Sequence, residues 1–130
     1  MEYIAVLAAA AGAYAFGAFW YMVNGKRWMT AAGITAEQVA GGAGKNPGPF
    51  IISAIMVIIV AGMMRHVFGM AGIDTIDKGL LAGLGLGAFI VAPWIVTNYA
   101  YSMRPKTLTV IDGAYAIIGC TIIGTILTLF

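Results

Sequence analysis

The sequence has few of the residues that most metal proteins and enzymes use. It contains one cysteine, Cys120, and one histidine, His66, whereas a zinc cluster takes three or four ligands and a disulfide takes two cysteines. A disulfide framework and a zinc cluster are therefore excluded. Neither residue has a neighbour suited to nucleophilic or acid–base catalysis, so we expect no catalytic residues, no metal and no cofactor.

Charged residues are also scarce, at 9% of the 130 residues, and the formal net charge is only +2. The basic residues are scattered between apolar runs and form no stripe, so nucleic acid is not an expected partner. A water-soluble domain needs far more charge to cover its surface. The shortage of charge therefore argues against a protein surrounded by water.

Long apolar runs fill the chain instead. Hydrophobic residues make up 62% of it and the mean hydropathy is +0.95, more than a chain of this size can hide inside itself. The remainder must face the lipid bilayer. Spanning the hydrocarbon takes about 20 apolar residues in a helix, and four stretches qualify: residues 3–23, 49–68, 79–101 and 108–130.

Because these stretches are apolar on every face, the alternation that a membrane barrel requires is missing. The sequence predicts an all-α polytopic membrane protein, a single domain made of a four-transmembrane-helix bundle. Pro49 suits the start of the second helix, where its missing N–H costs nothing. Residues 24–48 are a polar linker, in which residues 34–39 are a candidate interfacial helix capped by Thr35.

The distribution of Lys and Arg predicts the orientation, since short cytoplasmic loops accumulate them. On the side of the membrane opposite the first and third loops, the sequence has only Arg65 and Lys78. We expect the first and third loops in the cytoplasm and both termini in the periplasm of a bacterial inner membrane. The first and third loops carry Lys26, Arg27, Lys45, Arg104 and Lys106.

Small residues recur at helical spacing, and they allow helices to approach closely in lipid. The third helix repeats glycine every four residues, and the fourth places Cys120 and Gly124 on one face with Ala116. These faces either pack the bundle internally or bind another subunit. The candidate packing residues are Gly12, Gly17, Gly79, Gly83, Gly87, Cys120 and Gly124.

One level of the membrane collects most of the polar groups, each of which costs roughly 2–3 kcal/mol or more inside lipid unless compensated. Asp112 lies about 7 Å into the fourth helix and needs a cation or hydrogen-bond donors. The cluster is either a structural ion pair within an aromatic belt or a small binding site. Its candidate members are Trp20, Tyr21, Lys26, Trp28, Asn98, Arg104 and Asp112.

A second polar site is predicted at the opposite level, where Arg65 and His66 lie near the end of the second helix. We expect Asp74 and Asp77 as their partners, with a proton relay through His66 as the functional alternative. Pro93 removes one backbone hydrogen bond from the third helix and should kink it. Such a kink either shapes a cavity beside Asn98 or aids packing.

Short motifs match a known family nearly end to end. They are Gly17-x-x-Trp20-Tyr21, Gly25-Lys26-x-Trp28, Pro93 with Asn98, Arg104-Pro105 and Asp112-Gly113-x-Tyr115. By these residues the chain resembles the bacterial membrane family called domain of unknown function 1761. The resemblance implies a four-helix inner-membrane protein and no assigned activity. The elongated, Gly-rich stretch at residues 41–48 and the Arg65-His66 pair depart from the family pattern.

The sequence leaves two functions open. The first is an accessory or stabilising subunit of a larger membrane complex, for example a respiratory or photosynthetic one, or a self-associating bundle. The surplus of small-residue faces and the lack of a catalytic constellation favour it. The alternative is an oligomeric transporter or channel for ions or small solutes, with a polar site near Asn98 and Asp112. The absence of convincing similarity between the two halves of the chain weighs against transport.

Overall fold

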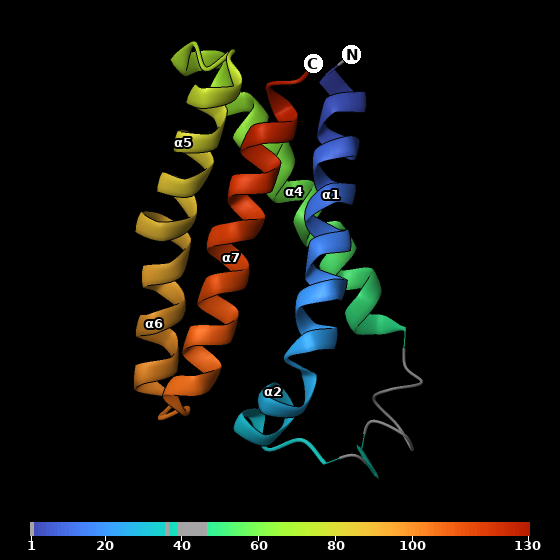
Figure 1. Ribbon diagram of the computed structural model, residues 1–130, viewed down its shortest axis with the longest axis vertical. Coiled ribbons are helices and arrows are strands. Elements are labelled where there is room, and N and C mark those ends of the chain that lie inside the picture. The colour runs from blue at the N-terminus through green and yellow to red at the C-terminus, as the bar shows by residue number, and fades with distance from the viewer. Residues whose placement is uncertain (1, 36, 39–46) are drawn as a thin grey trace.

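Four apolar helical segments run in alternating directions (Figure 1). The structure is a computed structural model that describes residues 2–35, 37–38 and 47–130. The segments are α1 (Glu2–Val23), α4 (Gly48–Ala71), the continuous run of α5 (Ile76–Leu86), η2 (Gly87–Val91) and α6 (Ala92–Tyr101), and α7 (Lys106–Leu127). All four are long and apolar enough to cross a membrane. This finding confirms the predicted fold class.

The helices end a few residues away from the predicted boundaries. The second extends to Ala71, the third begins at Ile76, and the fourth runs from Lys106 to Leu127. The added turns carry glycine or polar residues, which a criterion based on apolar length leaves out. Gly72, with φ of +69°, ends α4 in the left-handed conformation that suits glycine.

A short helix that the sequence analysis did not predict, α2 (Gly25–Ala32), follows α1 directly. It stops at Gly33, whose φ is +75° and whose N–H bonds to the carbonyls of Met29 and Thr30. Farther along the linker, the N–H of Gln38 donates to Thr35 Oγ1 and the N–H of Thr35 donates to Gln38 Oε1, at 3.1 and 2.8 Å. This reciprocal pair is a capping box, as expected for the predicted helix start at Thr35. Ala36 and Val39 of that prediction lie outside the described residues.

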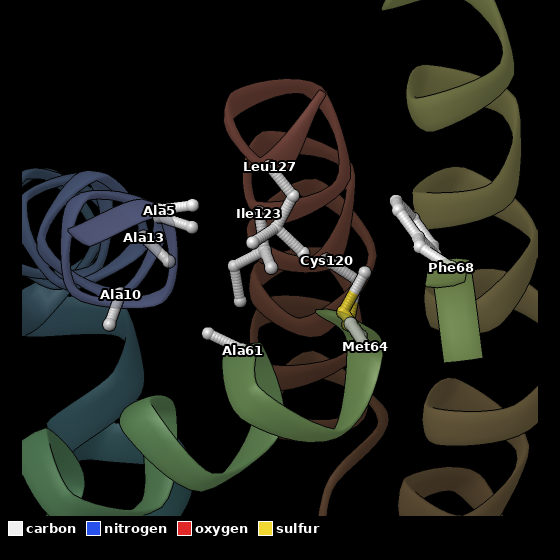
Figure 2. Close-up of a cluster of buried hydrophobic side chains, with 10 residues drawn as sticks. Ala5, Ala10, Ala13, Ala61, Met64, Phe68, Cys120, Ile123 and Leu127 are labelled. Carbon is white, nitrogen blue, oxygen red and sulfur yellow. The ribbon is translucent and has the colours of Figure 1, made fainter. Parts of the chain in front are cut away.

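The last helix, α7, is the centre of the bundle and contacts α1, α2, α4 and the run from α5 to α6 (Figure 1). Its inner face meets alanines of α1 and the Ala61 and Met64 side chains of α4, as Figure 2 shows. α4 packs mainly against α1 and more weakly against α7. The buried apolar cluster consists of Ala5, Ala9, Ala10, Ala13, Ala61, Met64, Phe68, Cys120, Ile123 and Leu127.

Glycines let α5 approach the backbone of α7. A Cβ atom on Gly79 would meet the carbonyl oxygen of Gly124, and one on Gly83 would meet that of Cys120. A Cβ on Gly87 would lie 2.7 Å from the Cα of Ile117. The predicted glycine face of the third helix therefore lies against the predicted small-residue face of the fourth.

The two predicted packing glycines of α1 also face α7. A Cβ on Gly12 would lie 2.5 Å from Ile126 Cδ1, and one on Gly17 would lie 2.8 Å from the Tyr115 ring. These neighbours are side chains, so the α1–α7 contact is less close than the backbone contact between α5 and α7. In lipid, such close contacts provide the dispersion attraction that holds helices together.

Pro93 is accommodated by a wider helical turn in the preceding segment. The N–H of Ala92 bonds to the carbonyl of Gly87, five residues back, which makes Gly87–Val91 a π-helix. Pro93 lies directly after this turn in a continuous helical run, and in a transmembrane helix such a π adjustment re-satisfies the backbone groups that a proline frees. Figure 1 shows α5 and α6 continuing as one column through this turn.

Candidate functional site

The predicted polar cluster forms at the end of the bundle where α1 passes into α2, α6 ends and α7 begins (Figure 1). Asp112 lies in the second turn of α7 and is half-buried. Tyr21 reaches it from the last turn of α1 and Trp28 reaches it from α2, while Trp20 of α1 reaches the backbone of the neighbouring Ile111. The break at Asn24 between the two helices puts all three aromatic side chains beside the start of α7.

Three aromatic donors hold the Asp112 carboxylate. Tyr21 and Trp28 donate to Oδ1 at 2.5 and 3.0 Å, and Tyr99 of α6 donates to Oδ2 at 2.5 Å. A hydrogen bond to a charged group contributes about 1.5–3 kcal/mol. None of the described basic residues forms an ion pair with the carboxylate, so aromatic hydrogen-bond donors stabilise it instead.

A second set of contacts fixes the donors. Trp20 Nε1 donates to the backbone carbonyl of Ile111 at 3.0 Å, and Asn24 Nδ2 donates to the carbonyl of Trp20 at 2.9 Å. The Tyr21 ring packs edge-on against Trp28 and Tyr115, with centroids 6.0 and 5.2 Å apart. The aromatic cluster thus ties α1, α2, α6 and α7 together around one carboxylate.

Three residues predicted for this cluster lie elsewhere. Lys26 is exposed on α2, and Asn98 is exposed on α6, where its backbone oxygen accepts from Ser102. Arg104 donates to the carbonyl of Ala32 at 3.1 Å and so caps the end of α2. Of the two possibilities left open for Asp112, a cation or neutral donors, the structure has neutral donors.

Tyr99 is the member of the cluster that sequence reasoning missed. It follows Asn98 directly, and the polarity of Asn98 attracted the prediction. Neighbouring helical residues point about 100° apart, so only one of the two can face α7. The tyrosine faces α7, as its bond to Asp112 shows.

The second polar site is not a single cluster. Arg65 donates to the backbone carbonyl of Leu127 at 3.1 Å, which attaches α4 to the end of α7. Asp74 pairs with Lys78 at 3.5 Å on the surface, and Asp77 is exposed. Neither aspartate forms an ion pair with Arg65 or His66 within the described residues.

Arg65 and His66 face a shallow pocket of about 490 Å³ between the start of α1 and the second half of α4. Glu2 lines the same pocket, so the acid near this basic pair comes from α1 and not from the second loop. Within the described ranges, no group of three or more His, Cys, Asp or Glu residues could hold a metal ion. Cys120 is a buried free thiol.

The fold and this cluster define a small four-span helical membrane protein whose polar residues lock helix ends together. The chain belongs to the family described as Protein of unknown function (DUF1761), whose model matches residues 4–128. This match confirms the family resemblance seen in the motifs. No curated protein and no solved structure matches the chain.

Proposed function

We propose that the protein is an interaction subunit of the inner membrane, which binds a further transmembrane helix along the outer face of α4. That helix belongs to a larger membrane complex or to a second copy of the chain. The observation that carries the proposal is the one-sided packing of α4. Only Ala61, Met64 and Phe68 are buried among its residues, although the helix is as long as the others.

The outer face of α4 has the spacing of a helix-docking seam, and its second half borders the pocket of about 490 Å³ that residues at the start of α1 also line. Ile55, Ile59, Gly62, His66 and Gly69 follow one another at alternating steps of four and three residues, the period at which helices interlock. A Cβ on Gly62 or on Gly69 would meet nothing within 4 Å. In contrast, the glycines that face α7 are all in close contact, so Gly62 and Gly69 leave room for a partner's backbone.

The interior of the bundle supports an interaction role over transport. No polar or charged side chain among the described residues is fully buried, and the cluster between the two polar ends is made of alanine, methionine, phenylalanine, isoleucine, leucine and cysteine. Both oxygens of Asp112 accept bonds from aromatic donors. A transported ion or solute would need a polar path, and this cluster offers none along its length, so an oligomeric transporter would need its path between subunits.

We also propose an orientation of the bundle in the membrane. α1 begins and α7 ends at one end of the bundle (Figure 1). The opposite end carries Lys26, Arg27, Arg104 and Lys106, which favours placing that end in the cytoplasm. Alkaline phosphatase fused after Phe130 should then be active in intact cells, and a fluorescent protein fused there should stay dark.

The test of association is Gly62→Leu, with Gly85→Leu as its matched control. A Cβ at either position meets nothing within 4 Å, so both variants should fold, but only the first fills the α4 seam. Purified in a mild detergent, the wild type and Gly85→Leu should retain the same partner or dimer, and Gly62→Leu should lose it. Mass spectrometry of the retained species distinguishes a foreign subunit from a second copy.

Two results would contradict the proposal. One is a wild-type protein that purifies alone as a monomer under native conditions. The other is a lone homo-oligomer that conducts a solute in vesicles and loses that flux in Asp112→Asn, which would favour transport.

A further inference from the structure

A groove lined by cationic and small side chains lies between α2 and the start of α7. Its volume is about 580 Å³. α2 forms one wall and the third loop with the first turn of α7 forms the other. The lining residues are Lys26, Arg27, Thr30, Ala31, Pro105 and Thr107.

The positive charge of this groove has no acidic counterpart among the described residues. Lys26 and Arg27 line it and form no ion pair, and the one described ion pair joins Lys78 to Asp74 at the opposite end. Asp112 is the acid nearest along α7, and its partners are aromatic donors rather than Lys26 or Arg27. Glu37, in the linker after α2, pairs with neither cation.

Backbone N–H groups at the start of α7 add neutral hydrogen-bond donors beside these cations. α7 begins at Lys106, so the N–H groups of Lys106 and Thr107 lie in its first turn, where a helix has no carbonyl of its own to offer them. A helix start also favours negative charge through its dipole. The side chain of Arg104 is engaged at the end of α2, which fixes the third loop against the groove's other wall.

The groove lies at one end of the candidate membrane spans, where that of α1 has ended and that of α7 begins. We expect lipid phosphates at this level, because they lie just outside the hydrocarbon that the spans cross. On α2, Lys26 and Arg27 are exposed while Trp28 and Met29 are partly covered. The inner face of α2 is held by the bundle, since Trp28 donates to Asp112, so the two cations are left exposed at the end of the bundle, where anionic headgroups attract basic side chains.

We infer that this groove binds the phosphate of an anionic phospholipid from the surrounding leaflet. Lys26 and Arg27 supply the charge, and the first turn of α7 supplies neutral donors. Ala31 and Pro105 provide apolar surface for the glycerol and upper acyl carbons. The inference does not depend on the α4 seam, because the groove is formed by α2 and α7.

The experiment compares two lipids with the same acyl chains, dioleoyl phosphatidylglycerol and dioleoyl phosphatidylcholine. The protein is purified in dodecylmaltoside and titrated with each lipid, and the bound lipids are counted by native mass spectrometry. Each basic side chain near an anionic lipid contributes roughly fivefold in affinity. The double variant Lys26→Gln with Arg27→Gln should therefore lower phosphatidylglycerol affinity by about 25-fold and leave phosphatidylcholine binding unchanged.

Two further variants separate a binding site from a general charge effect. Lys78→Gln removes a cation at the opposite end and should keep the wild-type preference. The double variant Lys26→Arg with Arg27→Lys keeps both positive charges and should also keep the wild-type preference for phosphatidylglycerol. Circular dichroism of every variant checks that the helices are intact.

Three outcomes would overturn the inference. The first is equal binding of both lipids by the wild type. The second is an equal loss of preference in Lys78→Gln and in the double variant. The third is displacement of phosphatidylglycerol by inorganic phosphate at the same concentration, which would assign the groove to a free anion.

Discussion

The close approach of α5 to α7 predicts a large effect of one methyl group at Gly83. An added Cβ would lie 3.0 Å from the Cα of Thr121 and nearer still to the carbonyl oxygen of Cys120. These atoms belong to a backbone and cannot rotate away, so α5 must shift outward and lose contact with α7. Forcing packed groups apart in this way costs about 1–3 kcal/mol.

The matched control is Gly85→Ala, two residues along the same helix. A Cβ there meets nothing within 4 Å, while replacement of glycine by alanine inside a helix gains up to about 1 kcal/mol. Both variants share that gain, so the difference between their free energies of unfolding gives the packing cost alone. We expect Gly83→Ala to be less stable than Gly85→Ala by about 1–3 kcal/mol.

The assay is reversible unfolding by sodium dodecyl sulfate in mixed micelles, followed by circular dichroism and tryptophan fluorescence. The free energy of unfolding is compared at equal detergent mole fraction for the wild type and both variants. Equal stability of the two variants would refute the reasoning. It would mean that α5 and α7 are not held by contact between their backbones.

Two other substitutions can be measured in the same assay. Tyr99→Phe removes one donor from the Asp112 carboxylate and should lower the free energy of unfolding by about 1.5–3 kcal/mol. Tyr101 is exposed, so Tyr101→Phe should change it little. Equal effects of the two substitutions would argue against a stabilising role of the aromatic cluster. Gly33→Ala places a Cβ at a φ of +75° and should cost about 1–2 kcal/mol of stability. Gly25→Ala, which has open space and no such φ, should be neutral or stabilising, and a matching loss there would rule out backbone strain as the cause.

The spans could be predicted because length and apolarity are local properties of the sequence. Their ends could not, since the added turns at Ile76 and Lys106 contain polar and charged residues, which a criterion based on apolar length leaves out. α2 was missed for a similar reason. Its polar residues suggested a linker, and its helix is stabilised by Trp28 bonding to Asp112 from the far end of the chain.

The site shows what depth alone can predict. Counting residues along alternating helices put Trp20, Tyr21 and Trp28 at the level of Asp112, and in the structure Tyr21 and Trp28 donate to its carboxylate. It could not give the direction in which each side chain points around its helix, so Arg104 was grouped with a carboxylate that it does not contact. Which way a side chain points from an apolar helix depends on the helices that it packs against. These partners cannot be read from the sequence of that helix alone.

The central place of α7 has a consequence for biosynthesis. A ribosome makes α1, α4 and α5 before it makes the helix against which α1 and α5 pack most extensively. Until α7 enters the bilayer, the glycines of α5 lack the backbone that they pack against, and the aromatic donors of α1 and α2 lack the carboxylate of Asp112. A chain stopped at Pro105 should therefore be degraded faster than the full sequence in a pulse–chase experiment, and equal lifetimes would show that the earlier helices hold together without α7.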